Sequence, residues 1–299
     1  MFLHQTLLTN KIYIMKKLIL SLALLGMFAV GCSEGFFDDT DSGNGKIYYT
    51  STTGDVVKPH PSASRSTFGA DIISNRYSSG QGVITFSDEV TTIGKSAFYT
   101  SQDLESIIIP NSVTTIGERA FSMCNSLTSV TIGNGVTTIG IKAFSGSALP
   151  SVTIPDNVTT IEEEAFSSTY LLTNITIGNG VTTIGRSAFS ESALPSVTIP
   201  NSVTKIGDYA FYWCRDLKSI TIGSGVTSIG KYAFEGFENL SVYCKATTPP
   251  SLGEHAFNCI NYDYSDVTIY VPTESVNAYK SAEDWSLYAN RIFGYDFSK

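Results

Sequence analysis

The chain has 299 residues, of which 42% are hydrophobic and 15% are charged, a length that corresponds to one large domain or two ordinary ones. The 19 Lys and Arg residues against 27 Asp and Glu give a net charge of −8, which argues against nucleic acid as a partner because phosphates favour basic surfaces. Five Cys residues are too few for a disulfide scaffold, and only three His residues argue against His-based catalysis or metal binding.

A short apolar run lies near the start of the chain. Two lysines precede residues 18–30, in which Ser21 is the one polar residue. This run is too short to cross a bilayer core of about 30 Å as a helix. A positive segment before a short apolar one is typical of a secretory signal. We therefore predict a signal peptide over residues 1–31, with Met15 as its expected start.

Small residues stand directly before Cys32, in the order Ala29-Val30-Gly31. They resemble the lipobox of bacterial lipoproteins, with Ala29 where Leu is usual. The resemblance implies that Cys32 is diacylated and becomes the mature N-terminus. Several acyl chains hold a protein firmly on a membrane, because each buried methylene contributes about 0.8 kcal/mol. A conventionally cleaved signal followed by an incidental Cys is the alternative.

Residues 32–46 are acidic and rich in Gly, a composition that predicts a flexible tether. Early acidic residues after the lipid-bearing Cys resemble the signal that exports lipoproteins to the cell surface in some Gram-negative anaerobes. The implied location is the bacterial outer membrane, with the protein lipid-anchored and surface-exposed.

Residues 47–82 are expected to form an N-terminal β cap, since an exposed end of a repeat array leaves apolar surface and unpaired backbone. Residues 47–50 and 56–57 are predicted to pair as a hairpin across Thr53-Gly54. Ile84 and Phe86 are then expected at the first strand positions of the array itself.

The main signal is an internal repeat over residues 83–272. The pair Ala-Phe recurs every 22 or 23 residues, and the pattern Val-Thr-x-Ile recurs upstream with the same steps. The repeated phenylalanines are Phe98, Phe121, Phe144, Phe166, Phe189, Phe211, Phe234 and Phe257. Two markers that keep one step predict a series of equivalent structural units.

One unit shows how its apolar residues reach a shared interior. Val130 and Ile132 are two apart and therefore share one face of a short strand. Gly or Pro after the strand allows a corner, and Val136, Ile139 and Phe144 return to the inside. About seven buried residues give roughly 10–20 kcal/mol, against roughly 35 kcal/mol to order a unit. A single unit therefore cannot fold, and stacked units predict a β-rich parallel solenoid of leucine-rich-repeat type with short strands and turns or short 3-10 segments, about 40 Å long for eight units.

Residues 273–299 are expected to form a helical C-terminal cap. Within residues 274–291, Val276, Tyr279, Ala282 and Trp285 follow one another at spacing three, which predicts an apolar stripe.

The repeated pattern Leu-x-x-Val-x-Ile-x-x-x-Val-x-x-Ile-Gly-x-x-Ala-Phe resembles the BspA-like leucine-rich repeats over residues 83–270. Unit eight departs from it, with Pro249-Pro250 in place of Val-Thr. The resemblance implies a bacterial surface lipoprotein that adheres to host proteins or other cells. It also implies a host or bacterial surface protein, or a glycan, as the partner.

Two columns of outward positions are candidates for binding. One is a ladder on the strands, of Thr85, Ile108, Thr131, Thr153, Thr176, Thr198 and Thr221, which fits plain β-propensity or a flat polar binding face. The other, just before Ala-Phe, comprises Ser96, Arg119, Lys142, Glu164, Ser187, Tyr209, Tyr232 and His255. Its late members are aromatic, with Tyr212, Trp213 and Phe237 nearby. We select Tyr209, Tyr212, Trp213 and Tyr232 as candidate ligand-binding residues, the alternative being rings that pack only on one another.

The remaining residues give no catalytic signal. No phosphate-binding Gly-rich loop or nucleophile motif occurs, so the chain is expected to be no enzyme and to need no cofactor or metal. Cys124, Cys214 and Cys244 are expected in the core, with Cys244 and Cys259 the one pair near enough to consider as a disulfide. We expect a monomeric, lipid-anchored adhesion protein. A glycan-binding accessory lipoprotein of a polysaccharide uptake system is the alternative.

Overall fold

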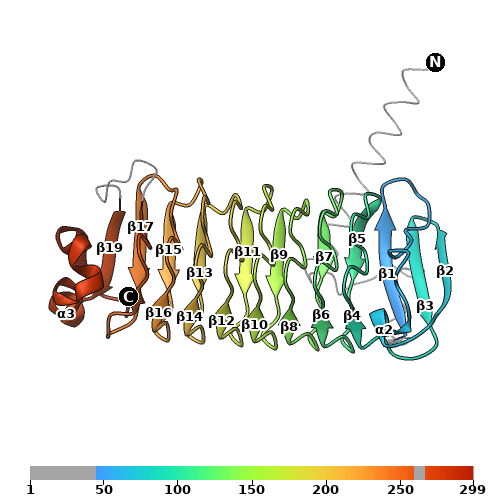
Figure 1. The fold of residues 1–299 in the computed structure, drawn as a ribbon, viewed down its shortest axis with the longest axis horizontal. Coiled ribbons are helices and arrows are strands. Elements are labelled where there is room, and N and C mark those ends of the chain that lie inside the picture. The colour runs from blue at the N-terminus through green and yellow to red at the C-terminus, as the bar shows by residue number, and fades with distance from the viewer. Residues whose placement is uncertain (1–44, 259–266, 299) are drawn as a thin grey trace, which may run out of the picture. The chain divides into compact units, whose positions relative to one another are not determined.

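The computed structural model describes residues 45–258 and 267–298, and there the repeats form a parallel solenoid (Figure 1). Each coil places a two-residue strand on one side, and these strands make one sheet. They are β4 (Thr92–Ile93), β6 (Thr115–Ile116), β8 (Thr138–Ile139), β10 (Thr160–Ile161), β12 (Thr183–Ile184), β14 (Lys205–Ile206), β16 (Ser228–Ile229) and β18 (Ser251–Leu252).

Longer strands lie on another side of the coils. They are β5 (Leu104–Ile108), β7 (Ser129–Thr131), β9 (Ser151–Ile154), β11 (Asn174–Ile177), β13 (Ser196–Ile199), β15 (Ser219–Ile222), β17 (Leu240–Cys244) and β19 (Val267–Pro272). Equivalent residues pair across coils, as Thr153 does with Thr176. Since side chains alternate along a strand, the ladder points outward as predicted from Ile108 to Thr221, and Thr153, Thr176 and Thr198 are exposed. The prediction is wrong for Thr85, which lies on a strand that pairs with residues 46–49 and not with the parallel stack.

The turn that carries Ala-Phe supplies a further ladder of backbone hydrogen bonds. The Phe121 N–H donates to the Ala143 carbonyl at 2.7 Å, and the Phe144 N–H donates to the Ala165 carbonyl at 2.8 Å. Each coil is thus bonded to its neighbours on several sides, which satisfies backbone groups that the buried interior could not leave unpaired.

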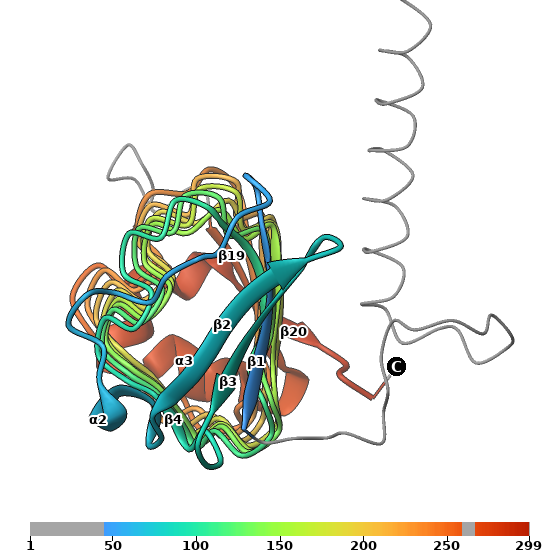
Figure 2. The ribbon, with the colours of Figure 1, turned by 90° about the vertical axis from the view of Figure 1, so that its right-hand side faces the viewer.

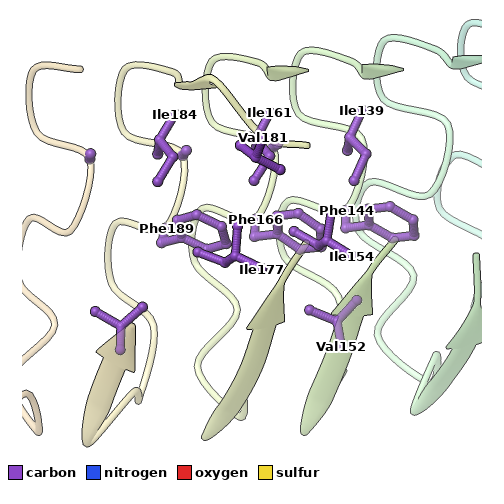
Figure 3. Close-up of a cluster of buried hydrophobic side chains, with 14 of the residues drawn as sticks. Ile139, Phe144, Val152, Ile154, Ile161, Phe166, Ile177, Val181, Ile184 and Phe189 are labelled. Atoms are coloured by element: carbon purple, nitrogen blue, oxygen red, sulfur yellow. The ribbon is translucent and has the colours of Figure 1, made fainter. Parts of the chain in front are cut away.

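The repeated phenylalanines form a single inward file, as the sequence predicts (Figure 3). Neighbouring ring centroids are 5.1–5.4 Å apart and the ring planes differ by 3–15° from Phe98 to Phe257. Viewed along the solenoid, the coils overlay one another (Figure 2). The core is therefore continuous from coil to coil, and only the outer surface is available for recognition.

The predicted N-terminal hairpin is wrong. β1 (Lys46–Ser51) lies between β3 (Gln81–Phe86) and β5 and is antiparallel to both, while β2 (Ile72–Ser78) pairs with the far edge of β3. Residues 56–57 form no strand, because the Val57 N–H donates instead to the Tyr49 hydroxyl at 3.2 Å. The alternation of apolar and polar residues along β1 predicts which of its faces points inward, but it does not predict the strand with which β1 pairs.

The position expected for Ile84 and Phe86 is also wrong. Both are buried, but they lie on β3, which is antiparallel to β1 and does not adjoin the parallel stack that begins at β5. The short helix α2 (Arg65–Phe68) is also part of the cap and packs against the first coil of the solenoid. The Thr91 N–H donates to the Phe68 carbonyl at 3.1 Å, and the Phe68 ring lies 6.1 Å from that of Phe98. The cap thus continues the backbone hydrogen bonds between coils and adds Phe68 to the end of the phenylalanine file.

The helical C-terminal cap is confirmed. It consists of η2 (Thr273–Ser275), α3 (Val276–Ser281) and η3 (Glu283–Arg291). Tyr279 and Trp285 are buried, and the Trp285 indole N–H donates to the Pro250 carbonyl at 2.7 Å. The sequence did not predict β20 (Ile292–Tyr295), which pairs parallel to β19 and follows the cap.

Cys124, Cys214 and Cys244 are buried free thiols, as expected. The Cys244 Sγ atom lies 3.2 Å from the Tyr279 hydroxyl oxygen, and Cys259 lies outside the described residues. Burial raises the pKa of Cys124 to about 12 and that of Cys214 to about 11, from an ordinary value of 9.0. Both thiols therefore favour the folded state most while they are protonated.

These thiols should be unreactive in the folded chain. In a Cys32→Ser/Cys259→Ser background, we expect no reaction with a disulfide reagent at pH 8 until denaturant unfolds the protein. A folded pKa above the unfolded one gives a stabilising contribution that is full below about pH 9 and is lost as the pH rises towards 11–12. The urea midpoint should fall over that range, and less so with Cys124→Ala/Cys214→Ala added. Rapid labelling of the folded chain would contradict the burial.

Candidate functional site

The four selected residues come together on the side of the solenoid. The rings of Tyr209 and Tyr232 stack at 5.2 Å, and Tyr212 meets Tyr209 edge-on at 5.4 Å. The rings of Tyr212 and Trp213 lie 5.8 Å apart. Tyr209 and Tyr232 occupy the same position in successive coils, so the repeat itself places one ring above the other. We call these four residues the aromatic cluster.

A left-handed backbone turns part of this cluster away from the core. Tyr209, Trp213 and Tyr232 have φ angles of 58°, 55° and 55°, in a region that non-glycine residues seldom adopt. The Tyr209 N–H donates to the Lys231 carbonyl at 2.9 Å, and the Trp213 N–H donates to the Glu235 carbonyl at 2.7 Å. These bonds to the next coil stabilise the strained backbone and direct the side chains outward.

The same conformation occurs at every member of the outer column. Its φ angles lie between 51° and 58° at Ser96, Arg119, Lys142, Glu164, Ser187, Tyr209, Tyr232 and His255. The sequence did not reveal this, because the residues differ in chemistry and none is glycine. The stacked turns impose the conformation, so the column is a fixed row of outward side chains.

Two arginine side chains and a histidine ring lie against the aromatic cluster. The Arg215 guanidinium carbon is 4.2 Å from the centroid of the Trp213 ring, and that of Arg186 is 5.7 Å from the Tyr209 ring. The His255 ring lies 5.3 Å from that of Tyr232. The two arginine contacts are attractive because the ring face is negative, so the cluster extends beyond its four selected members.

Exposure separates the members of the cluster. Trp213 is 43% exposed, whereas Tyr209, Tyr212 and Tyr232 are half-buried, because each is partly covered by a neighbouring ring. Phe237 was expected among the exposed aromatics, and this is wrong, since it is buried. It lies three residues after the repeat Phe, like Cys124 and Cys214, and that shared position was a signal of burial.

A pocket of about 390 Å³ lies beside the cluster, between Trp213 and Tyr170. Tyr170 is 64% exposed, and its hydroxyl donates to Glu191 Oε2 at 2.9 Å. Arg215 and Asp216 complete the Trp213 side. Sequence reasoning missed Tyr170, Glu191, Arg215 and Asp216, because none of them belongs to the repeated pattern.

The coil between the two walls of the pocket is shorter than the coils that carry them. Six positions separate the repeat Phe from the next buried Leu in the flanking coils, but five in the coil between them. The pairs are Phe166 and Leu172, Phe211 and Leu217, and in the short coil Phe189 and Leu194. The flanking connections project farther and become the walls, whereas Ser192 and Ala193 form part of the floor. This difference in length can be seen in the sequence and could have pointed to the pocket.

Other chemistry has little support in the described ranges 45–258 and 267–298. No group of three or more His, Cys, Asp or Glu residues there could hold a metal ion. Nor is any helix in those ranges long and apolar enough to cross a membrane. Cys32, the predicted signal peptide and the predicted tether (apart from Gly45 and Lys46) lie outside the described residues, so the lipid anchor stays a prediction.

The BspA type leucine-rich repeat region matches residues 77–195 and 182–282, in six copies. The chain belongs to this family. Repeats of this family typically form non-catalytic binding surfaces, and the absence of enzymatic activity in this member stays a prediction.

Solved structures of other bacterial proteins are similar to this member of the BspA-type family. A leucine-rich repeat protein of T. pallidum is 27% identical, with a TM-score of 0.41, over 56% of this chain and 68% of that one. A leucine-rich cell surface protein of Faecalibacterium prausnitzii is 26% identical, with a TM-score of 0.39, over 67% and 68%. The pneumococcal vaccine antigen PcpA is 16% identical, with a TM-score of 0.31, over 69% and 75%. None of the curated proteins matches the chain.

Proposed function

We propose that this BspA-type protein is a cell-surface binding rod, attached to the bacterial outer membrane through lipid on Cys32. Its function is adhesion to host proteins or to other cells. The observation that carries this proposal is the aromatic cluster, in which rings that the core does not use are fixed on the outside by left-handed turns. Rings of this kind contribute much of the energy at protein interfaces.

The architecture supports the same proposal. The interior is filled by the phenylalanine file and the buried aliphatic residues, so recognition falls to the side surface. Successive coils repeat that surface at the spacing of β-strands, about 4.8 Å. A broad, rigid surface of this kind suits a large partner better than a small molecule.

A second candidate function is supported by the pocket between Tyr170 and Trp213. The protein would then be a glycan-binding accessory of a polysaccharide uptake system. A glycan array run beside a panel of host-matrix proteins separates the two functions. Binding to matrix proteins that is lost with Tyr209→Ala/Tyr232→Ala favours adhesion, and saccharide binding that the same change removes favours the accessory role.

Surface display and anchoring have direct tests. Protease treatment of intact cells should remove the protein together with known outer-surface proteins, and survival of the intact chain would exclude adhesion. Cys32→Ala should release the protein from the membrane fraction, with Cys259→Ala as the matched control that stays attached. Retention of the Cys32→Ala protein would refute the lipid anchor.

A further inference from the structure

We propose that the pocket between Tyr170 and Trp213 binds one sugar unit of a neutral glycan chain. This inference rests on the proposed function, since it names the ligand class that one part of the binding surface recognises. Four features carry it: the fixed conformation of the rings, their exposure, their separation and the polar groups between them.

Trp213 is held in place although it is exposed. Its ring lies over Gly236 of the next coil, where a Cβ atom would collide with Trp213 Cδ1. The Tyr212 ring and the Arg215 guanidinium pack against it, at 5.8 Å and 4.2 Å from its centroid. A ring that is fixed before binding loses little conformational entropy when a ligand arrives.

Tyr170 forms the opposite wall and is also anchored. Its hydroxyl donates to Glu191 Oε2 at 2.9 Å, and the Ser168 hydroxyl lies 3.3 Å from the same oxygen. Tyr170 belongs to one flanking coil and Trp213 to the other, so their backbones are two coil steps, or about 10 Å, apart along the solenoid. The pocket of about 390 Å³ that the two side chains line has room for one pyranose ring.

The polar groups suit sugar hydroxyls. A hydroxyl both donates and accepts, and here carboxylates of Glu191 and Asp216 accept while the Arg215 guanidinium donates. The aromatic walls suit the C–H faces of a sugar, because rings bury large apolar area at low entropic cost. The pocket therefore matches both the apolar C–H faces and the polar hydroxyl groups of a sugar.

Charge favours a neutral glycan over other ligands. Two carboxylates and one guanidinium give the pocket a net charge of about −1, on a chain of net charge −8, which repels sulfated glycans. Because the Arg215 guanidinium packs against the Trp213 ring, a sugar would meet the part of that ring which stays exposed. We therefore place a neutral saccharide, and not a polyanion, in this pocket.

The test is affinity electrophoresis of the full chain in gels that contain soluble neutral polysaccharides, such as xylan, mannan, starch and β-glucan, with quenching of Trp fluorescence by matched oligosaccharides. At least one neutral polysaccharide should retard the protein. Trp213→Ala and Tyr170→Ala should each weaken its binding by at least about tenfold. Ala193→Trp, which fills the floor, should abolish it.

Leu171→Ala is the matched control, because Leu171 is 57% exposed and adjoins Tyr170 without lining the pocket. It should bind like the parent, and circular dichroism should show all variants folded. Failure of every neutral polysaccharide to bind, preference for heparin or polylysine, or unchanged binding by Trp213→Ala and Ala193→Trp would overturn the proposal. If no neutral polysaccharide binds but the protein still attaches cells, this inference alone fails and the proposed function stays intact.

Discussion

Phe166→Ala should lower the free energy of unfolding by about 4 kcal/mol. Phe166 is fully buried, with its ring centroid 5.1 Å from that of Phe144 and 5.4 Å from that of Phe189. Removing the ring leaves a cavity in the middle of the file and ends two stacking contacts. Because each coil of a solenoid contacts only its neighbours, the effect falls on both interfaces of this coil.

Phe166→Ala should also make the coils after residue 166 unfold at a different urea concentration from the coils before it. Trp213 and Trp285 both follow Phe166 in the chain, so Trp fluorescence reports the C-terminal coils, whereas circular dichroism reports all of them. In urea, the two signals should coincide for the parent and separate for Phe166→Ala. Phe166→Leu keeps most of the volume and should cost about 1.5 kcal/mol or less. A Phe166→Ala protein as stable as the parent would refute a continuous core.

Gly225→Ala should destabilise the chain by about 3 kcal/mol or more. Gly225 lies at the corner after β15, and a Cβ atom there would overlap the backbone carbonyl oxygen of Asn201 in the preceding coil. The φ angle of Gly225 is not positive, so the effect comes from the collision and not from backbone conformation. The overlapping atom is backbone, so the two coils must move apart.

Ser224→Ala is the matched control at the same corner. Ser224 is exposed, and its backbone N–H donates to Asn201 Oδ1 at 3.0 Å, a bond that alanine keeps. We expect a change within about 0.5 kcal/mol. Urea denaturation of both variants measures the difference, and equal stability of Gly225→Ala and Ser224→Ala would contradict the close approach of these coils.

The corner glycines also explain an alternation in the sequence. Gly135, Gly180 and Gly225 belong to coils in which a Cβ atom would overlap the preceding coil. The coils between them have Asn157 and Ser202 at that position, and the coil before Gly135 has Ser112. The Ser202 hydroxyl donates to the Val181 carbonyl at 2.8 Å. Between residues 112 and 225, corners with glycine thus alternate with corners that carry a polar side chain.

Some errors of the sequence reasoning arose where the repeat pattern stops. The inward positions of Ile47 and Ile84 follow from alternation, but the partner of β1 depends on how the cap closes over the first coil. Phe237 differs, because its place in the coil matches that of the buried Cys214, and aromatic character alone suggested exposure. Position within the coil decided its burial.

The candidate site was predicted in part. The repeat brings Tyr209 and Tyr232 together, because equal positions in successive coils stack. The left-handed turns could not be predicted, since that conformation depends on hydrogen bonds to the next coil and not on residue type. Tyr170 was missed because its role depends on the shorter neighbouring coil.

The sequence by itself determined the parallel solenoid, the phenylalanine file and the helical end, because each follows from a pattern that every coil repeats and that only stacking can bury. The tertiary structure alone decided the pairing of the N-terminal cap, the outward turn of the aromatic column and the pocket at Trp213. These features depend on contacts between different coils or on a difference in their lengths, and a local pattern does not record which backbone atoms will meet.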